Sequence, residues 1–505
     1  MHLPGLRAQR PLTEPHPMSE EAGSLAELQS RYGTRHRWLL LVTVMIGSMA
    51  AIISSTIMNV GIPDMSLQFG IGQERAQWVS SSFMVAMTVS MLTTPWLLVR
   101  FGYRRTFMGC MWLLMTAGMA GGVSTDYNLV LVARVAEGLA AGVVQPIPAI
   151  IILRAFDTSE QGRANSFFGM GVVLAPAIGP SIGGLLVDWM GWRSLFFMVV
   201  PFCLGSMWMA LRYVPTTAPG GVSANLGKPS LDVGGLTLAT LGTLCLLNGL
   251  VTLHGGQTGL ATGLIGVALA CFVGFVAWQR YQAAQGGLPL MNLALFSHRT
   301  FAMGTLVAFT YGIALFGSTY LIPVYLQLGL GLSPSHVGTL MLPAGLVLAV
   351  TIAVVGRYSS THPTHLLVSV GLTLLSLSFA LMCIVNLQTA LWVLVALAIL
   401  GRIGLGFVLP SLNIGAMRSL DKQMIPQGAS AINFLRMLGG ATGVSLCGIL
   451  LEWRLSAHGD SLTNVVTSPA RLAAFDEVFL MLAATCSLAL LAAWQIREAP
   501  HRTRA

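Results

Sequence analysis

Long apolar runs separated by short polar segments make up most of this chain. About fourteen runs reach the roughly 20 residues that a helix needs to cross about 30 Å of hydrocarbon. They begin near Trp38, Trp78, Thr106, Tyr127, Ala164, Leu195, Val233, Leu260, Phe301, Val337, His365, Leu391, Gly428 and Val478. The apolar residues are continuous and lack the alternation of a membrane β-barrel, so the pattern predicts helices. We expect an all-α polytopic membrane protein with about 14 transmembrane helices.

Composition and charge add an orientation. Of the 505 residues, 54% are hydrophobic and 9% are charged, against about 25% charged in soluble domains. Most of the 27 Lys and Arg residues fall at the termini and in even-numbered loops. The exceptions in odd-numbered loops are Arg75, Arg193, Arg454 and Arg471. The positive-inside rule therefore predicts a multi-pass protein of the plasma (inner) membrane with both termini cytoplasmic.

Several classes of partner and cofactor are not expected. The net charge of +9 does not indicate nucleic-acid binding, because the basic residues lie in short loops and tails that suit an anionic lipid bilayer. All seven cysteines fall in apolar runs without a CxxC or Cys/His cluster, which predicts small hydrophobic side chains rather than metal ligands. The sequence has no GxxxxGK phosphate loop, which excludes an ATP-driven pump.

The runs divide naturally as six, two and six. We predict a cytoplasmic N-terminal tail (1–37), an N-terminal six-helix bundle (38–214), a cytoplasmic linker (215–231), two additional transmembrane helices (232–281), a C-terminal six-helix bundle (282–496) and a cytoplasmic tail (497–505). A weak repeat supports the two bundles: RVAEG from Arg134 corresponds to RIGLG from Arg402, an offset of 402 minus 134, or 268. Transporters built from repeated bundles bind substrate near the midplane between them.

Few charged side chains lie deep in the apolar runs, where each costs at least about 2.5 kcal/mol unless it is paired or hydrated. Arg134 and Glu137 are three residues apart, so they share a helix face and can neutralise each other. A proton-coupled carrier needs a buried acid, since burial favours the protonated form. Glu137 is the acid that falls in mid-helix; the others, Asp476 and Glu477 included, fall near the ends of runs. The pair has two readings, a proton-coupling site or a static ion pair.

Other polar residues in the runs are candidates for a substrate cavity. Arg402 and Arg436 have no acid on their own helix turn, so they meet either backbone carbonyls or an anionic group in an aqueous cavity. Polar side chains that could line the same cavity are Ser54, Asn59, Gln145 and Asn413. Hydrogen bonding between helices is the commoner use of such residues.

One apolar run contains an unusual set of glycines and prolines, GVVLAPAIGPSIGG, from Gly171 to Gly184. Proline removes a backbone donor, so Pro176 and Pro180 should bend or loosen the helix. Small residues at every fourth position form a ridge that another helix can approach closely: Gly171, Ala175, Gly179 and Gly183.

This run closely matches the antiporter signature of exporters of the major facilitator superfamily, and Gly184 completes it. From about Trp38 to Trp494 the chain resembles the fourteen-span drug:proton antiporter branch. STIMNVGIP from Ser55, PWLLVRFGYRR from Pro95, SEQGRA from Ser159 and ASAINFLRMLGGATGVS from Ala429 carry the resemblance, together with RVAEG. It implies the major facilitator fold and a cytoplasmic gate, for which the matching residues are Arg100, Gly102, Arg104 and Arg105.

The departures from the family pattern concern the acids. The family's acid in the first span falls on Ser54, the acid before the loop arginine falls on Val99, and the family's glutamine in the fourth span is Glu137. If the protein is proton-coupled, the coupling acid is therefore Glu137.

The resemblance implies secondary active efflux of amphipathic or hydrophobic drugs by alternating access, driven by a proton gradient with no other cofactor. A periplasmic fusion protein is a partner in some members of the family. The alternative is an exporter or permease for one defined metabolite, which is an anion if Arg134, Arg402 or Arg436 meets its charge. A membrane-embedded enzyme or a non-transporting sensor is a remote alternative, and we expect no enzymatic activity.

Overall fold

The computed structural model describes residues 25–496 except 72, 77, 217–229, 255–256, 333, 360, 387 and 461–467. The side chains of 26, 63, 73–74, 173–181, 254 and 334–335 also lie outside the description. Every regular element of the described residues is a helix.

The helices form three groups. The N-half contains α1 (Leu25–Tyr32), α2 (His36–Phe69), α3 (Gln73–Ala76), α4 (Trp78–Ser90), α5 (Thr94–Phe101), α6 (Tyr103–Val123), α7 (Tyr127–Val144), α8 (Ile147–Ala155), α9 (Thr158–Met190), α10 (Ser194–Phe197) and α11 (Val199–Tyr213). The central hairpin contains α12 (Val233–His254) and α13 (Thr258–Ala284). The C-half contains α14 (Arg299–Val324), α15 (Pro334–Tyr358), α16 (Thr364–Met382), α17 (Leu391–Gly415), α18 (Ile425–Ala457) and α19 (Pro469–Ala493). The residue bounds that the sequence predicts for the bundles and the linker stay a prediction. Most of the linker lies outside the described residues.

Thirteen stretches of the described helices are long and apolar enough to cross a membrane. The fourteenth predicted run is α9, a helix of 33 residues. Three predicted spans are interrupted: a 3-10 turn at Met91–Thr93 separates α4 from α5, residues 145–146 separate α7 from α8, and Met198 separates α10 from α11. Pro95 and Pro146 lie at the first two breaks, where their missing N–H groups disfavour a continuous helix.

The last predicted span begins earlier than the sequence indicated. Its apolar run begins near Val478, but α19 begins at Pro469. Ser468 caps the helix by accepting a hydrogen bond from the Arg471 N–H at 3.0 Å. The first two turns carry charged residues, which is why an apolar run alone places the start too late.

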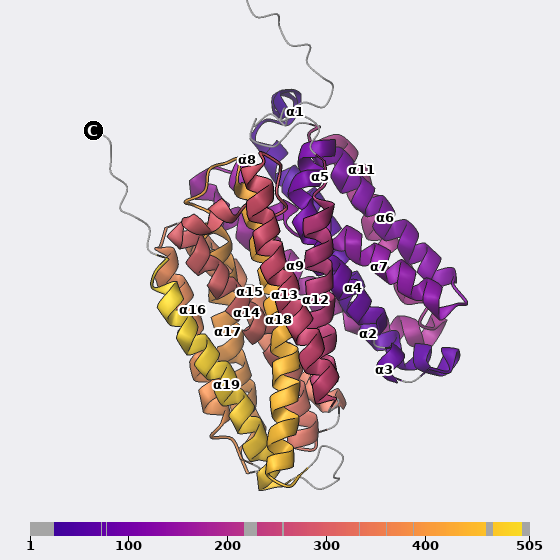
Figure 1. Ribbon diagram of the computed structural model, residues 1–505, viewed down its shortest axis with the longest axis vertical. Coiled ribbons are helices and arrows are strands. Elements are labelled where there is room, and N and C mark those ends of the chain that lie inside the picture. Colours follow the sequence, from indigo (N-terminus) through magenta and orange to yellow (C-terminus); the bar gives the residue numbers. More distant parts are fainter. Residues whose placement is uncertain are drawn as a thin grey trace, which may run out of the picture.

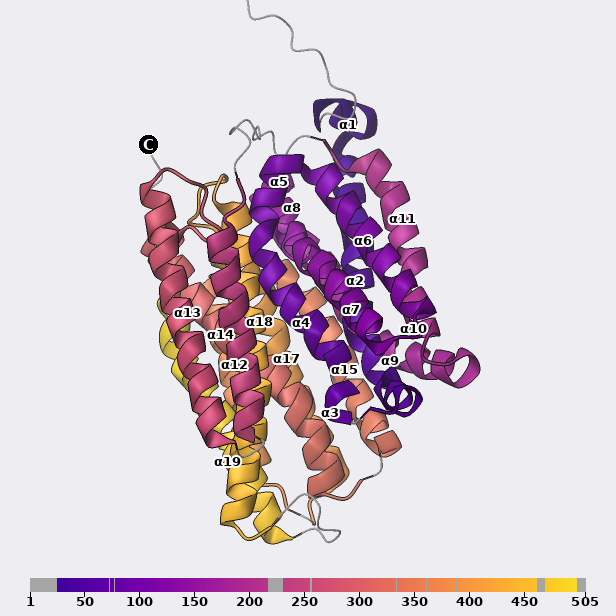
Figure 2. The same cartoon turned by 45° about the vertical axis from the view of Figure 1, so that its right-hand side comes forward.

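The N-half and C-half stand side by side, and the central hairpin covers one side of them (Figures 1 and 2). Helix α12 packs against α13, against α18 of the C-half and against α4 of the N-half. Helix α2 begins and α19 ends at the top of Figure 1, and we call this the terminal end of the molecule. The other end is the opposite end.

Glycines allow close helix packing at equivalent places in the two halves. A Cβ atom on Gly138 of α7 would overlap the Phe83 carbonyl of α4. Gly406 of α17, 268 residues later, would in the same way meet Thr351 of α15 at 2.7 Å. The repeat seen in the sequence therefore corresponds to the same type of helix contact in both halves.

A buried carboxylate holds the base of the central hairpin. Asp232, 5% exposed, accepts hydrogen bonds from Trp278 Nε1 at 2.7 Å, Gln279 Nε2 at 2.7 Å and Gly235 N at 2.8 Å. Gln279 Oε1 in turn accepts from the Met291 N–H, just before the C-half. Asp232 thus joins both hairpin helices to the chain that follows them.

We expect Asp232→Ala to destabilise the hairpin, because it leaves three donors without an acceptor, each worth about 1–3 kcal/mol when buried. The expected result is faster proteolysis within residues 233–284 and a lower unfolding temperature in detergent. Asp188→Ala is the matched control, since Asp188 is exposed. Equal proteolysis of both variants would contradict this role.

Candidate functional site

An ion pair lies at the centre of the N-half. Arg134 Nη1 donates to Glu137 Oε2 at 2.6 Å, and both side chains are fully buried. The two residues follow one another on α7 at a spacing of three, which puts them on one face of the helix. The structure therefore brings together the two residues that the sequence singled out.

The walls around this pair are made by other helices of the N-half. Arg134 Nε donates to the Val79 carbonyl at 3.0 Å, and its guanidinium lies 4.2 Å from the centre of the Phe83 ring, both on α4. Gly118 of α6 leaves room for the carboxylate, because a Cβ there would lie 3.0 Å from Glu137 Oε1. Glu137 Oε1 has no hydrogen-bond partner among the described residues. One carboxylate oxygen is therefore paired and the other is free.

Ser54 of α2 completes the site. Arg134 Nη1 donates to Ser54 Oγ at 2.9 Å, and Nη2 donates to the Ser54 carbonyl at 3.2 Å. The nitrogen that contacts Glu137 thus also contacts Ser54. The position where the family has an acid and the position where this chain has one therefore contact the same nitrogen of Arg134.

The glycine ridge of α9 faces α2, within the same half. A Cβ on Gly171 would lie 2.6 Å from Met45 Sδ, and one on Gly183 would lie 2.7 Å from Ile57 Cγ1. Gly184 has no atom of another helix within 4 Å of its Cβ position. The backbone of α9 is helical throughout, but the side chains of Ala175, Pro176, Gly179 and Pro180 lie outside the description, so the bend stays a prediction.

The predicted gate residues lie at the terminal end, in the N-half. Gly102 separates α5 from α6 with a φ of 78°, and a Cβ there would lie 2.8 Å from the Thr216 carbonyl oxygen. Arg104 Nε donates to the Val214 carbonyl at 2.7 Å, which ties α6 to the end of α11. Arg100 and Arg105 are exposed. None of these residues makes a hydrogen bond to the C-half in the part of the chain that is described.

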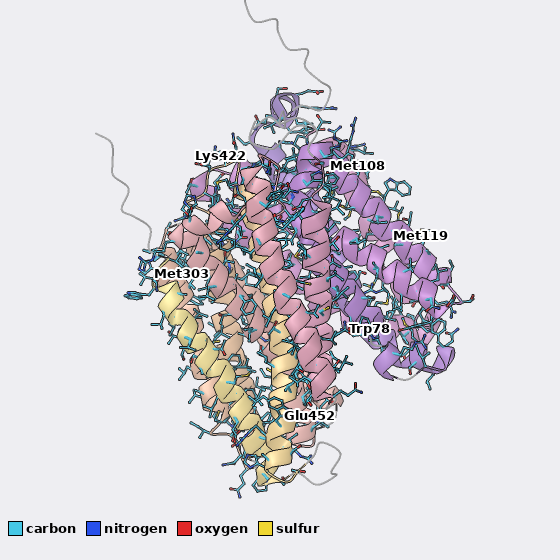
Figure 3. All side chains as sticks on the ribbon, in the orientation of Figure 1. Trp78, Met108, Met119, Met303, Lys422 and Glu452 are labelled. Atoms are coloured by element: carbon cyan, nitrogen blue, oxygen red, sulfur yellow. The ribbon has the colours of Figure 1, made fainter. Side chains whose placement is uncertain are left out.

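Two residues that sequence reasoning missed join the halves instead. Arg154, at the end of α8, donates from Nη2 and Nε to the Lys422 carbonyl at 2.6 and 3.1 Å. Asn165 Nδ2 of α9 donates to the Pro410 carbonyl of α17 at 3.0 Å. Lys422 lies at the terminal end (Figure 3). A basic residue at the end of the fourth span was the available signal for Arg154.

We expect Arg154→Gln to open the terminal end more often. A hydrogen bond from a charged group contributes about 1.5–3 kcal/mol, so losing this link should raise the open population about tenfold. The measurement is maleimide labelling of Ser166→Cys, since Ser166 packs against Gly356 of α15 at this seam. The exposed Arg100→Gln is the control. If Arg100→Gln raises labelling and Arg154→Gln does not, the resemblance-based gate is right and this one is wrong.

The other candidate polar residues do not join the ion pair. Asn59 Oδ1 accepts from Ser80 Oγ at 2.7 Å, between α2 and α4, and Gln145 lies at the break between α7 and α8. Arg402 and Arg436 lie in the C-half, half-buried, and Asn413 lies three turns beyond Arg402 on α17. The cavity set predicted from the sequence is therefore divided between the two halves.

One acid lies deeper than the sequence indicated. Because α19 begins at Pro469, Asp476 is in its second turn, and its Oδ1 is buried without a hydrogen-bond partner among the described residues. Glu477 beside it forms an ion pair with Arg454. Sequence reasoning missed Asp476 because the helix start was placed after it.

Two cavities occur away from the ion pair. One of about 700 Å³ lies between α4, α6, α7 and α12, with an almost wholly apolar lining that extends from Trp78 (Figure 3) to Arg105. Another of about 430 Å³ lies at the seam of α9 and α15, and Arg163 and Arg357 line it. Neither cavity has Arg134 or Glu137 in its lining.

Comparison with known proteins identifies the fold. The sequence profile of the Major Facilitator Superfamily matches residues 44–444. The "Multidrug export protein EmrB" of Haemophilus influenzae is 27% identical over 434 residues, covering 84% of this chain and 82% of that protein. The "Multidrug resistance protein B homolog" of Mycobacterium tuberculosis H37Rv is 26% identical, covering 81% of this chain and 75% of its own length.

Two further matches are to an uncharacterized transporter and to a solved structure. The "Uncharacterized MFS-type transporter YhcA" of Bacillus subtilis is 23% identical, covering 87% of this chain and 81% of its own length. Among solved structures, the human organic anion transporter MFSD10 (TETRAN) superposes with a TM-score of 0.62 at 15% identity, covering 90% of this chain and 99% of that one. With a family profile across most of its length and helices of membrane-spanning length throughout, the chain belongs to the major facilitator superfamily and is a multi-pass membrane transporter with two six-helix bundles and two additional central helices.

Proposed function

We propose that this transporter exports amphipathic or hydrophobic compounds in exchange for protons. The observation that carries the proposal is the Arg134–Glu137 pair, a buried acid with one paired oxygen and one free oxygen. Buried charges in a membrane are expensive, and such residues commonly belong to ion or proton pathways. The relatives in Haemophilus and Mycobacterium are named a multidrug export protein and a multidrug resistance protein homolog, and these names favour the same substrate class.

The proposed cycle uses two states of Glu137. As an anion it neutralises Arg134; when a proton binds to the carboxylate, the ion pair is lost and Arg134 keeps only its neutral partners, Ser54 and the Val79 carbonyl. That change alters the balance of contacts between α7, α2 and α4. Proton binding can in this way bias one of two arrangements of the halves.

We assign an orientation and a state on the same basis. The positive-inside rule places the terminal end in the cytoplasm of a cell whose plasma (inner) membrane holds the protein. Among the described residues, the hydrogen bonds from Arg154 and Asn165 join the two halves, and both lie toward the terminal end. In this orientation the described state is closed toward the cytoplasm, the state in which an exporter releases substrate and takes up a proton.

The test is transport in everted membrane vesicles with an imposed proton gradient. Fluorescent cationic, neutral and anionic amphipathic compounds should accumulate while the gradient lasts, and a protonophore should collapse the accumulation. Uptake of several scaffolds supports multidrug export, whereas uptake of a single compound supports the alternative of a dedicated metabolite exporter. Accumulation that does not respond to the gradient would overturn proton coupling.

A further inference from the structure

Two arginines lie well inside membrane-spanning helices of the C-half, away from the helix ends. Arg402 is close to the middle of α17, Arg436 is in the first half of α18, and Tyr311 is at the middle of α14. Helix α14 packs against both α17 and α18, and its Tyr311 is 2% exposed. A Cβ on Gly312 would overlap the Arg436 carbonyl, so α14 and α18 approach closely at this level.

Neither arginine has an acid as partner. Arg436 Nη2 donates to Asn433 Oδ1 at 2.5 Å, and within the described residues Arg402 makes no hydrogen bond or ion pair. The sequence contains no Asp or Glu between residues 233 and 420. The C-half acids lie toward helix ends, as Glu452 does at the opposite end in Figure 3.

The repeat shows what is missing. Arg402 corresponds to Arg134 of the N-half, and the residue that corresponds to Glu137 is Leu405, which is 1% exposed. The N-half neutralises its arginine within the protein, and the C-half does not. Each unpaired charge at the bilayer centre costs about 2.5–3.5 kcal/mol or more, so two half-buried arginines without a counter-ion point to an anion supplied from outside.

We propose that Arg402 and Arg436 bind the carboxylate or sulfonate of an amphipathic anion at the inner wall of the C-half. This inference rests on the proposed export function and names its substrate class. Guanidinium groups suit the site because they stay charged and bind carboxylates bidentately.

The experiment uses the full-length protein in detergent and three compounds with one ring system: naphthalene-1-carboxylate, the neutral 1-carboxamide and the cationic 1-methylammonium compound. Affinity is read from the ligand-dependent shift in unfolding temperature. We expect the carboxylate to bind wild type at least about tenfold more tightly than the amide, and Arg402→Gln or Arg436→Gln to remove that preference. Lysine at either position should retain part of it. Arg280→Gln, on the exposed surface of α13, should leave it intact.

Three outcomes would overturn the inference. In the first, the wild-type protein binds the amide and the carboxylate equally. In the second, the glutamine variants keep the preference for the carboxylate. In the third, the glutamine variants lose binding of both ligands alike, which would mean that the arginines have a structural role. If the glutamine variants do not fold, the wild-type preference and the lysine variants decide the matter. An inorganic anion such as chloride should compete only at far higher concentration; equal competition would mean that the site binds any anion and not this substrate class.

The outcome is separable from that of the proposed function. Binding of the carboxylate is measured without a proton gradient, so it does not depend on coupling. Proton-coupled export with no preference for anions would refute this inference alone. Anion binding without gradient-dependent transport would refute the proposed export function alone.

Discussion

Glu137→Gln should abolish proton exchange in everted vesicles, and adding Ser54→Asp should restore part of it. Glutamine keeps the shape of the side chain but can neither release nor bind a proton near neutral pH. It also leaves Arg134 buried without a counter-ion, which costs about 3–5 kcal/mol. The second substitution returns a carboxylate to the neighbourhood of Arg134 Nη1, because Ser54 Oγ lies 2.9 Å from this nitrogen.

The double variant separates coupling from folding. If Glu137→Gln fails because the protein does not fold, Ser54→Asp restores the counter-ion and the folded yield. If the double variant also regains proton exchange, coupling requires an acid beside Arg134 but does not require that acid to be on α7. Asp188→Asn, an exposed acid, is the matched control and should exchange protons as wild type does. Full exchange by folded Glu137→Gln would show that the pair is a static contact.

Gly142→Ala is the packing change with the largest expected effect. Its Cβ would overlap the Met87 carbonyl and the Ser90 hydroxyl of α4, and the backbone carbonyl can move only with its helix. Overpacking a core usually destabilises a protein by about 1–3 kcal/mol. We expect Gly142→Ala to reach or exceed the upper end of this range, because the added Cβ has to displace backbone atoms. Displacing α4 would also move the Val79 carbonyl and the Phe83 ring that hold Arg134.

The measurement is the unfolding temperature in detergent together with transport. Gly205→Ala of α11 is the control, because no atom lies within 4 Å of its Cβ position and alanine is the better helix former by about 1 kcal/mol. We expect Gly142→Ala to unfold at a lower temperature and Gly205→Ala at an equal or higher one. Equal unfolding temperatures for Gly142→Ala and wild type would mean that α4 and α7 pack less closely than described.

The two halves differ in how they treat charge, and this has a functional meaning under the proposals made above. The N-half holds a neutralised pair at Arg134 and Glu137, whereas the C-half holds Arg402 and Arg436 without an acid. Coupling would then belong to the first half and recognition of the substrate's charge to the second. Alternating access needs both, since a proton can drive export only if the halves move together.

The sequence alone determined the fold class, the positions of most helices and the Arg134–Glu137 pair. These follow from local rules: a run of apolar residues long enough to span the bilayer, and a spacing of three that puts two side chains on one helix face. The same rules missed the start of α19, because Arg471, Asp476 and Glu477 interrupt its apolar run and place the predicted start after them. The sequence pattern predicts a structural feature when the residues that determine it lie within one helix.

Only the tertiary structure decided which residues from different helices meet. Ser54 and Glu137 are 83 positions apart and contact the same nitrogen of Arg134. Arg154 donates to the backbone carbonyl of Lys422, a bond that does not depend on the lysine side chain. The ridge of Gly171 and Gly183 was evident in the sequence, but its contact with α2 was not. Contacts between helices depend on packing angles and on backbone atoms that every residue shares, so no residue pattern encodes them.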